Sequence, residues 1–149
     1  MRVFNPQLVK RDVNYAVYAP QVTAAPTVVD VLHRVNIARM AHGLLPLARH
    51  DGLATSAQVW AEHLRDTNTF EHGAWAERIS EHYAHWRTIG ENIAGGYTTA
   101  QDAVAAWMAS EGHRANILNA DFEEAGVGYA EGGYYGKYYV MDYGARFKS

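Results

Sequence analysis

The sequence predicts an α+β domain in which helices cover a central antiparallel sheet. Apolar residues recur at helical spacing between residues 27 and 110, and the pattern changes to every second residue after Gly126. No strand–helix–strand unit repeats, which argues against a parallel α/β sheet. A chain of 149 residues with 48% hydrophobic and 19% charged residues suits one compact core.

Capping signals place the first two helices. Thr27 followed by Asp30 forms a capping box at the start of the first helix, and Gly43 is expected to end it. Asp51 is the expected N-cap of the second helix. One face of that helix is apolar through Leu53, Ala57, Trp60 and Leu64.

The remaining elements follow in the same way. A third helix is predicted from Trp75 to about residue 83, and Thr99 with Asp102 caps a fourth that runs to about Ser110. Residues 125–131 and 137–144 alternate and are separated by glycines, so we predict two strands joined by a hairpin. Tyrosines crowd this region, and they indicate either cross-strand packing or an exposed aromatic surface.

Residues 1–26 form a separate region, which we interpret as an extended arm preceding a domain over 27–149. The arm contains Pro6, Pro20 and Pro26 and lacks helical periodicity. It is too apolar for a solvated tail, so we expect it to bury its side chains. It either adds an edge strand to its own domain or contacts another subunit or protein.

Composition excludes several classes of function. The chain has no cysteine, which excludes disulfides, thiolate metal sites and cysteine nucleophiles. A net charge of −3 with scattered basic residues makes nucleic acid an unsuitable partner. The sequence shows no apolar run long enough to span a membrane and no signal-peptide pattern at its start.

Several motifs occur in a fixed order. Residues 90–94 are Gly-Glu-Asn-Ile-Ala, and residues 107–118 follow the pattern Trp-x-x-Ser-x-x-His-Arg-x-Asn-Ile-Leu. Upstream, residues 36–39 are Asn-x-x-Arg and residues 43–47 are Gly-Leu-x-Pro-Leu, and downstream residues 125–128 are Ala-Gly-Val-Gly. Together they resemble the CAP superfamily of cysteine-rich secretory, antigen 5 and pathogenesis-related-1 proteins, in its bacterial cysteine-free form.

The resemblance implies an α-β-α sandwich with a central antiparallel sheet and a cleft lined by histidines and acids. His72 and His113 are similar to the cavity histidines of the family, and Glu91 to the acid of a Gly-Glu-Asn turn. Ser110 stands where many relatives carry a second glutamate, and Arg114 follows His113 in the same motif. We expect all five side chains at the cleft.

Two imidazoles and a carboxylate suit Zn²⁺ or another divalent cation, so His72, His113 and Glu91 are candidate metal ligands. Alternatively, these residues only tie down a loop, a turn and a helix end. Ser110 and His113 lie three residues apart, but no Gly-x-Ser-x-Gly elbow accompanies them. We therefore do not interpret Ser110 as a nucleophile.

Three functions remain open. The first is a non-enzymatic extracellular, surface or particle-associated module that binds a protein, lipid, cell-wall or other small-molecule ligand through its cleft. The second is a metal-dependent hydrolase that uses His72, His113 and Glu91, with the carboxylate as general base. The third is a structural subunit of a larger assembly, such as a virion, docked by its N-terminal arm.

Overall fold

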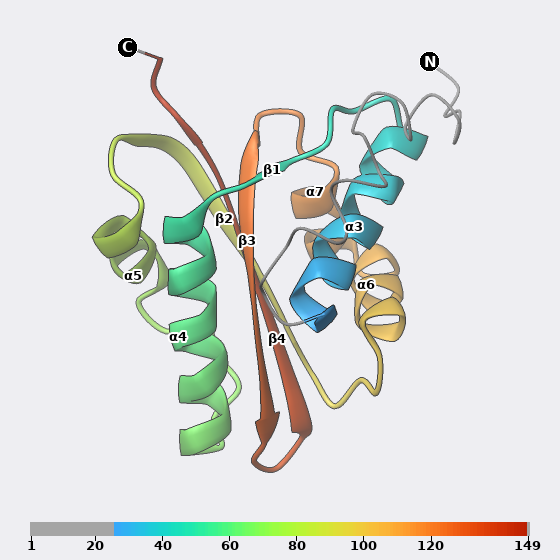
Figure 1. The fold of residues 1–149 in the computed structure, drawn as a ribbon, viewed down its shortest axis with the longest axis vertical. Coiled ribbons are helices and arrows are strands. Elements are labelled where there is room, and N and C mark those ends of the chain that lie inside the picture. The colour runs from blue at the N-terminus through green and yellow to red at the C-terminus, as the bar shows by residue number, and fades with distance from the viewer. Residues whose placement is uncertain (1–25, 149) are drawn as a thin grey trace.

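A computed structural model describes residues 26–148, which form five helices and a four-stranded sheet (Figure 1). The helices are α3 (Pro26–Ala41), α4 (Asp51–Thr67), α5 (Trp75–His82), α6 (Ala100–Met108) and α7 (Glu111–Ile117). The strands are β1 (Ala48–Arg49), β2 (Trp86–Gly95), β3 (Glu124–Gly132) and β4 (Gly136–Arg146). The predicted arm over residues 1–26 lies almost entirely outside the described residues.

The sheet has the order β1-β3-β4-β2. The predicted hairpin is confirmed, because β3 and β4 pair antiparallel from Glu124↔Gly144 to Gly132↔Gly136. Strand β2 pairs antiparallel with the other side of β4, whereas the two-residue strand β1 pairs parallel with β3. The sheet is therefore mixed, with one short parallel strand added to the antiparallel core that the sequence predicts.

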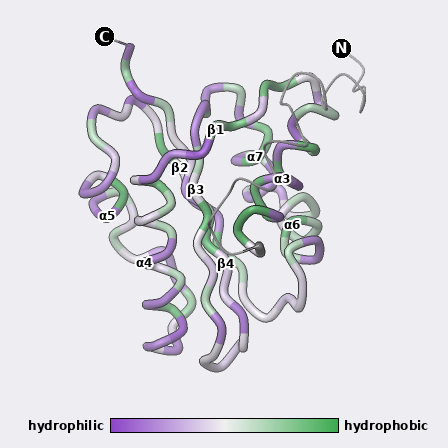
Figure 2. The backbone as a smooth tube through the Cα atoms, viewed as in Figure 1, coloured by the Kyte–Doolittle hydropathy of each residue, from purple (hydrophilic) through white to green (hydrophobic). Residues whose placement is uncertain are grey.

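Helices cover both faces of the sheet, as the resemblance implies (Figure 1). Helices α4 and α5 lie on one face, and α3, α6 and α7 lie on the other. Side chains of β4 alternate between these layers, since Tyr138 and Val140 pack with α4 while Tyr139 and Met141 join the opposite core. In Figure 2 hydrophilic and hydrophobic colours alternate along the turns of α4, as expected for a helix with one buried face.

Strand β3 differs strongly between its two faces. Toward α3 and α6 it presents Ala125, Val127 and Tyr129, whereas toward α4 it presents glycine. A Cβ on Gly126 would meet the backbone of Ala54 at 2.0 Å, and one on Gly128 would meet the backbone of α4 at 2.4 Å. The Ala-Gly-Val-Gly motif thus lets the helix backbone approach the strand directly.

Helix boundaries differ in detail from the prediction. Thr99 accepts a hydrogen bond from the Asp102 N–H and caps α6 as predicted. The cap of α4 is His50 and not Asp51, because Nδ1 of His50 accepts the Gly52 N–H at 3.0 Å. Helix α3 begins at Pro26, one residue before the predicted Thr27.

The Asn-x-x-Arg motif of α3 ties this helix to the chain on either side of it. Asn36 exchanges two hydrogen bonds with the backbone of Leu47. Arg39 is 2% exposed and donates to backbone carbonyls of Leu45, Ile117, Asn119 and Phe122. These carbonyls lie outside regular ladders, so the two side chains supply donors that secondary structure does not.

None of the helices within residues 26–148 combines the length and the apolar character needed to cross a bilayer.

Candidate functional site: a pair of histidines at the edge of strand β2

The site forms where the outer edge of β2 meets the two helical layers. In an antiparallel edge strand, alternate carbonyls point away from the sheet and need other donors. Asn116 of α7 donates to the Glu91 carbonyl at 3.1 Å, and Trp107 of α6 donates to the Ile93 carbonyl at 3.0 Å. The Trp-to-Asn motif therefore anchors α6 and α7 along β2 and brings His113 to the segment that contains Glu91, where Asn92 donates to the His113 carbonyl.

The Gly-Glu-Asn segment is part of strand β2 and not a turn, which corrects the expectation for Glu91. Strand geometry sends neighbouring side chains to opposite faces. Glu91 points to the α4 and α5 layer, while Asn92 donates to the Tyr143 hydroxyl and to the His113 carbonyl. The segment thus contacts both helical layers through consecutive residues.

His72 lies in the loop before α5 and contacts Glu91. Nδ1 of His72 is 2.8 Å from Oε1 of Glu91, and the Glu91 side chain is only 1% exposed. Burial raises the pKa of Glu91, but hydrogen bonds from His72 and Asp142 and the charge of Arg78 outweigh burial and hold the pKa below its usual value. An ionised carboxylate only accepts, so Nδ1 of His72 carries the proton and donates.

His113 lies in α7 and contacts Ser110. Nδ1 of His113 is 2.9 Å from the Ser110 hydroxyl, and this N-cap serine makes no side-chain hydrogen bond to the helix backbone. Burial lowers the pKa of His113, and the nearby charge of His72 lowers it further. The neutral form of His113 therefore predominates at neutral pH.

The structure thus brings His72, Glu91, Ser110 and His113 to one edge of the sheet, and we call these four residues the histidine site. In each histidine the inward ring nitrogen has a partner, and no described residue forms a hydrogen bond or ion pair with either Nε2. The His72 side chain is 43% exposed. Both Nε2 atoms therefore remain open to an incoming ligand.

Arg114, the fifth residue expected there, contacts a different part of the molecule. Its guanidinium donates to Nε2 of His42, 3.2 Å away at the end of α3, and His42 in turn donates from Nδ1 to the Ala38 carbonyl. Helical geometry explains the separation, because consecutive side chains on a helix point about 100° apart.

Sequence reasoning missed the buried charges beneath His72. Arg78 of α5 lies 2.8 Å from Oε2 of Glu91 and 3.3 Å from Oδ2 of Asp142, and it donates to the Ser56 hydroxyl at 3.1 Å. Asp142 carried a usable signal, since it interrupts the apolar alternation of Tyr138 and Val140 on the α4 face of β4. No comparable pattern singles out Arg78 within its helix.

The residues present do not complete a metal site by themselves. Zinc sites in proteins use three or four side-chain ligands. Both oxygens of Glu91 are engaged by His72 and Arg78, and residues 26–148 contain no group of three His, Asp or Glu side chains that could hold an ion. The metal ligands expected from sequence stay a prediction, with two free imidazole nitrogens as the available donors.

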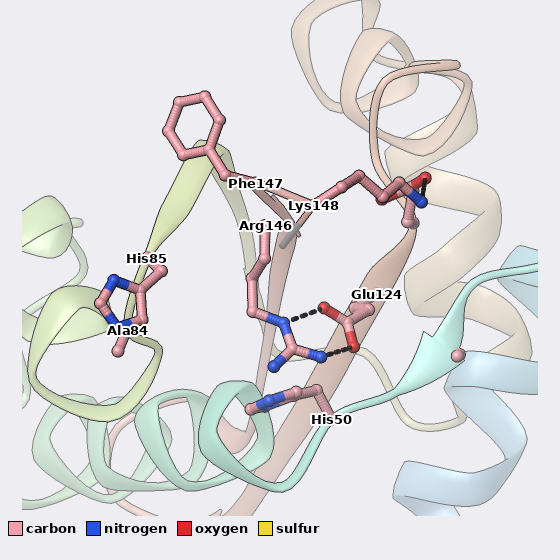
Figure 3. Close-up of a pocket in the computed structure, with 9 residues that line it drawn as sticks. His50, Ala84, His85, Glu124, Arg146, Phe147 and Lys148 are labelled. Atoms are coloured by element: carbon pink, nitrogen blue, oxygen red, sulfur yellow. Dashed lines mark hydrogen bonds and ion pairs between the residues drawn. The ribbon is translucent and has the colours of Figure 1, made fainter.

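A separate concavity lies at the end of the sheet where β4 finishes, and none of the predicted site residues lines it (Figure 3). Arg146 donates two hydrogen bonds to the Glu124 carboxylate, which also accepts from the Tyr83 hydroxyl. Figure 3 shows the His50 ring beside this pair and Phe147 turned away from it. The strongest charges of this groove are therefore already paired with each other.

The fold and the site define a small α-β-α sandwich with paired histidines at a sheet edge. Residues 32–143 match the CAP family, described as the cysteine-rich secretory protein family. The chain belongs to this family, and the resemblance noted in its motifs is confirmed.

Two relatives come from Bacillus subtilis (strain 168). The chain is 39% identical over 121 residues to the uncharacterized protein YkwD, and the match covers 74% of this chain and 47% of YkwD. It is 33% identical over 119 residues to the uncharacterized membrane protein YlbC, covering 76% and 33% of the two chains. The chain thus spans about half or less of the length of these relatives.

Solved structures give the same fold. An extracellular protein containing an SCP domain from Bacillus anthracis str. Ames matches with a TM-score of 0.72 and 30% identity, covering 80% of this chain and 40% of that one. An outer surface protein from Borrelia burgdorferi matches with a TM-score of 0.73 and 21% identity, covering 78% and 90%. This second likeness concerns the fold alone.

Proposed function

We propose that the chain is a non-enzymatic, extracellular CAP module that binds a hydroxyl-bearing ligand, of the kind found in cell-wall glycans, between His72 and His113. The observation that carries the proposal is the arrangement of the two rings. Each holds its inward nitrogen with a protein partner and leaves Nε2 free. The description of the Bacillus anthracis relative as an extracellular protein supports the location.

The chemistry of the rings favours a ligand that donates hydrogen bonds. A neutral imidazole with its proton on Nδ1 presents a lone pair at Nε2, and a lone pair accepts from hydroxyl or amine groups. The Glu91 carboxylate holds Nδ1 of His72 inward as the donor, so Nε2 is the ring atom that faces a ligand. An anionic ligand would meet these lone pairs and the buried negative charge of Glu91, which disfavours it.

Exposed aromatic rings beside the His72 loop support a ligand with flat apolar faces. Phe70, two residues before His72, packs edge-on against Tyr135 with ring centroids 5.6 Å apart, and Tyr134 packs edge-on against Tyr135 at 5.2 Å. Phe70 and Tyr135 are each 46% exposed, and Tyr134 is 80% exposed. A tyrosine side chain combines an apolar ring face with a hydroxyl, so it can contact both the C–H face and the hydroxyls of a sugar.

The hydrolase alternative finds less support in the geometry. A general base must reach the water it activates, and Glu91 directs Oε1 to His72 and Oε2 to Arg78. The Ser110 hydroxyl meets Nδ1 of His113, but no carboxylate of the described residues orients that ring. Docking of a larger assembly through residues 1–26 stays a prediction outside the described part of the chain.

Binding of the full chain to insoluble peptidoglycan by sedimentation tests the proposal. We expect His72→Ala and His113→Ala each to weaken binding at least tenfold, because each removes an acceptor for the ligand. His42→Ala is the matched control, since His42 is also an exposed histidine near α7 but bonds Arg114 instead. Equal binding by the wild type and both site variants contradicts the proposal. A parallel Zn²⁺ titration of the same proteins tests the metal prediction separately.

A further inference from the structure

Beneath the histidine site lies a buried cluster of charges that the proposed function does not use directly. Arg78 is 9% exposed, and its guanidinium lies 4.5 Å from the centre of the Trp60 ring. The same guanidinium donates to the His72 carbonyl at 3.3 Å and contacts Glu91 at 2.8 Å. One side chain therefore touches both the loop that carries His72 and the carboxylate that orients its ring.

The cluster contains two carboxyl groups for one arginine. Glu91 and Asp142 are direct register partners on β2 and β4, are 6% and 0% exposed, and both contact the guanidinium of Arg78. Two buried carboxylates side by side would repel strongly in this environment. A proton on one of them removes this repulsion.

Unpartnered atoms in the cluster fit such a proton. Oε2 of Glu91 and Oδ1 of Asp142 are both buried without a hydrogen-bond donor. The 2.8 Å contact of Arg78 with Oε2 is an ion-pair distance without the alignment of a hydrogen bond. A single proton on Asp142, donated to Glu91, would give both oxygens a partner.

The surroundings of Asp142 determine which carboxyl holds the proton. Asp142 faces Arg78 from α5, the Ser56 hydroxyl from α4 and Glu91 from β2, and its register partner on β3 is Gly126. Burial, followed by the hydrogen bond and charge of Glu91, raises the pKa of Asp142 well above its usual value. Glu91, by contrast, has donors on both sides and stays ionised.

We propose that Arg78 is the positioning residue of the histidine site and that it acts together with a neutral Asp142. Arg78 and the Asp142 carboxylic acid hold Glu91 as an anion with Oε1 turned to His72, which keeps an N–H on Nδ1 of His72 pointing inward and Nε2 pointing outward. This inference rests on the proposed function only for what the site binds. The placement of the two protons can be measured without any ligand.

Carboxyl carbon NMR on the uniformly labelled full chain tests the shared proton directly. At neutral pH we expect the Asp142 carboxyl carbon to show the shift of a neutral acid and Glu91 that of a carboxylate. No substitution is needed, so a failure to fold does not interfere. An ionised Asp142 at neutral pH overturns the proposal.

Nitrogen NMR of the His72 ring tests the positioning role. Asp142→Asn keeps a neutral hydrogen-bond donor, so we expect Nδ1 of His72 to remain protonated. Arg78→Met removes the cation, and we expect the His72 tautomer to become mixed and peptidoglycan binding to fall about 10–100-fold, the size of loss seen when residues that orient metal-ligating histidines are replaced. Arg78→Lys keeps the charge and serves as the folded alternative, with partial recovery expected.

The outcomes separate the two proposals. A His72 tautomer unchanged in folded Arg78→Met, or lost in Asp142→Asn, contradicts the positioning role. If the tautomers behave as expected while His72→Ala leaves peptidoglycan binding intact, only the proposed ligand fails.

Discussion

Among residues 26–148, each face of the sheet contains one buried arginine, and the two have different partners. Arg39, in the α3 layer, donates to four backbone carbonyls and to no carboxylate of the described residues. Arg78, in the α5 layer, contacts the side chains of Glu91 and Asp142 and the ring of Trp60. The first holds loops together, and the second lies directly under the histidine site.

The comparison shows that the partners of a buried arginine indicate its role. Carbonyl partners are neutral and do not titrate, so Arg39 forms a fixed structural tie whose strength does not follow the protonation of a carboxyl group. Carboxyl partners exchange protons with solvent and with each other, so the charge around Arg78 depends on its neighbours. A buried arginine among carboxyl groups therefore calls for a functional interpretation before a structural one.

The largest expected effect on stability comes from removing the hydrogen bonds of Arg39 to backbone carbonyls. Arg39→Met should lower the free energy of unfolding by about 4 kcal/mol, because four carbonyls lose their donor within a buried region. Urea unfolding followed by circular dichroism measures it. Arg34→Met, which removes only a surface pair with Asp30, should change it by about 0.5 kcal/mol or less. If Arg39→Met and Arg34→Met lower the free energy of unfolding equally, the four carbonyl bonds of Arg39 contribute no more than an exposed ion pair.

The next largest effect on stability is expected where α4 approaches β3 closely. Gly128→Ala should cost about 2–3 kcal/mol, because the new Cβ meets the α4 backbone at 2.4 Å and the helix must move. Gly112→Ala in α7 is the control, since a Cβ there meets nothing within 4 Å. Thermal unfolding of both variants checks this, and a stable Gly128→Ala would show that the α4 layer is loosely packed.

Loss of the hydrogen bond between α6 and the edge of β2 should have a smaller effect on stability. Trp107→Phe should lower the free energy of unfolding by about 1–2 kcal/mol, because the buried Ile93 carbonyl loses its donor. Trp86→Phe removes a bond to the Ser80 hydroxyl at the surface and should cost clearly less. Urea unfolding compares them, with a similar loss in both variants as the contrary result.

The smallest expected effect is a pH dependence confined to the α5 layer. A carboxyl whose pKa is raised on folding binds its proton more tightly in the native state, so its contribution to stability is present at low pH and lost as pH rises toward the folded-state pKa. Asp142→Asn removes this loss. Between acidic and neutral pH, the free energy of unfolding of Asp142→Asn should therefore rise relative to that of the wild type. A difference between the two proteins that does not change with pH contradicts this prediction.

The histidine site was predictable where the motif residues are also the anchors. Ser110 and His113 lie along β2 beside Glu91 and its partner His72, because Trp107 and Asn116 of the same motif fix α6 and α7 on this strand. These spacings are local, so a single sequence contains them.

The buried partners were not predictable in the same way. Arg78 and Asp142 are 64 residues apart and meet only because β4 pairs with β2 in one register beneath α5. Strand β2 itself was missed, since its glycines and its burial on both faces hide the alternation by which an exposed strand is recognised. Arg114 bonds His42 although it follows His113 in the motif, because adjacency in a motif does not imply a common direction on a helix.

The side chains that close the outer edge of β2 also affect association between molecules. An open edge strand of ten residues would offer unpaired backbone groups as a template for a strand from another copy. Trp107 and Asn116 occupy two of these acceptors, and the opposite edge of the described sheet is a strand of only two residues, β1. The motif that builds the histidine site therefore also protects the domain against edge-to-edge aggregation.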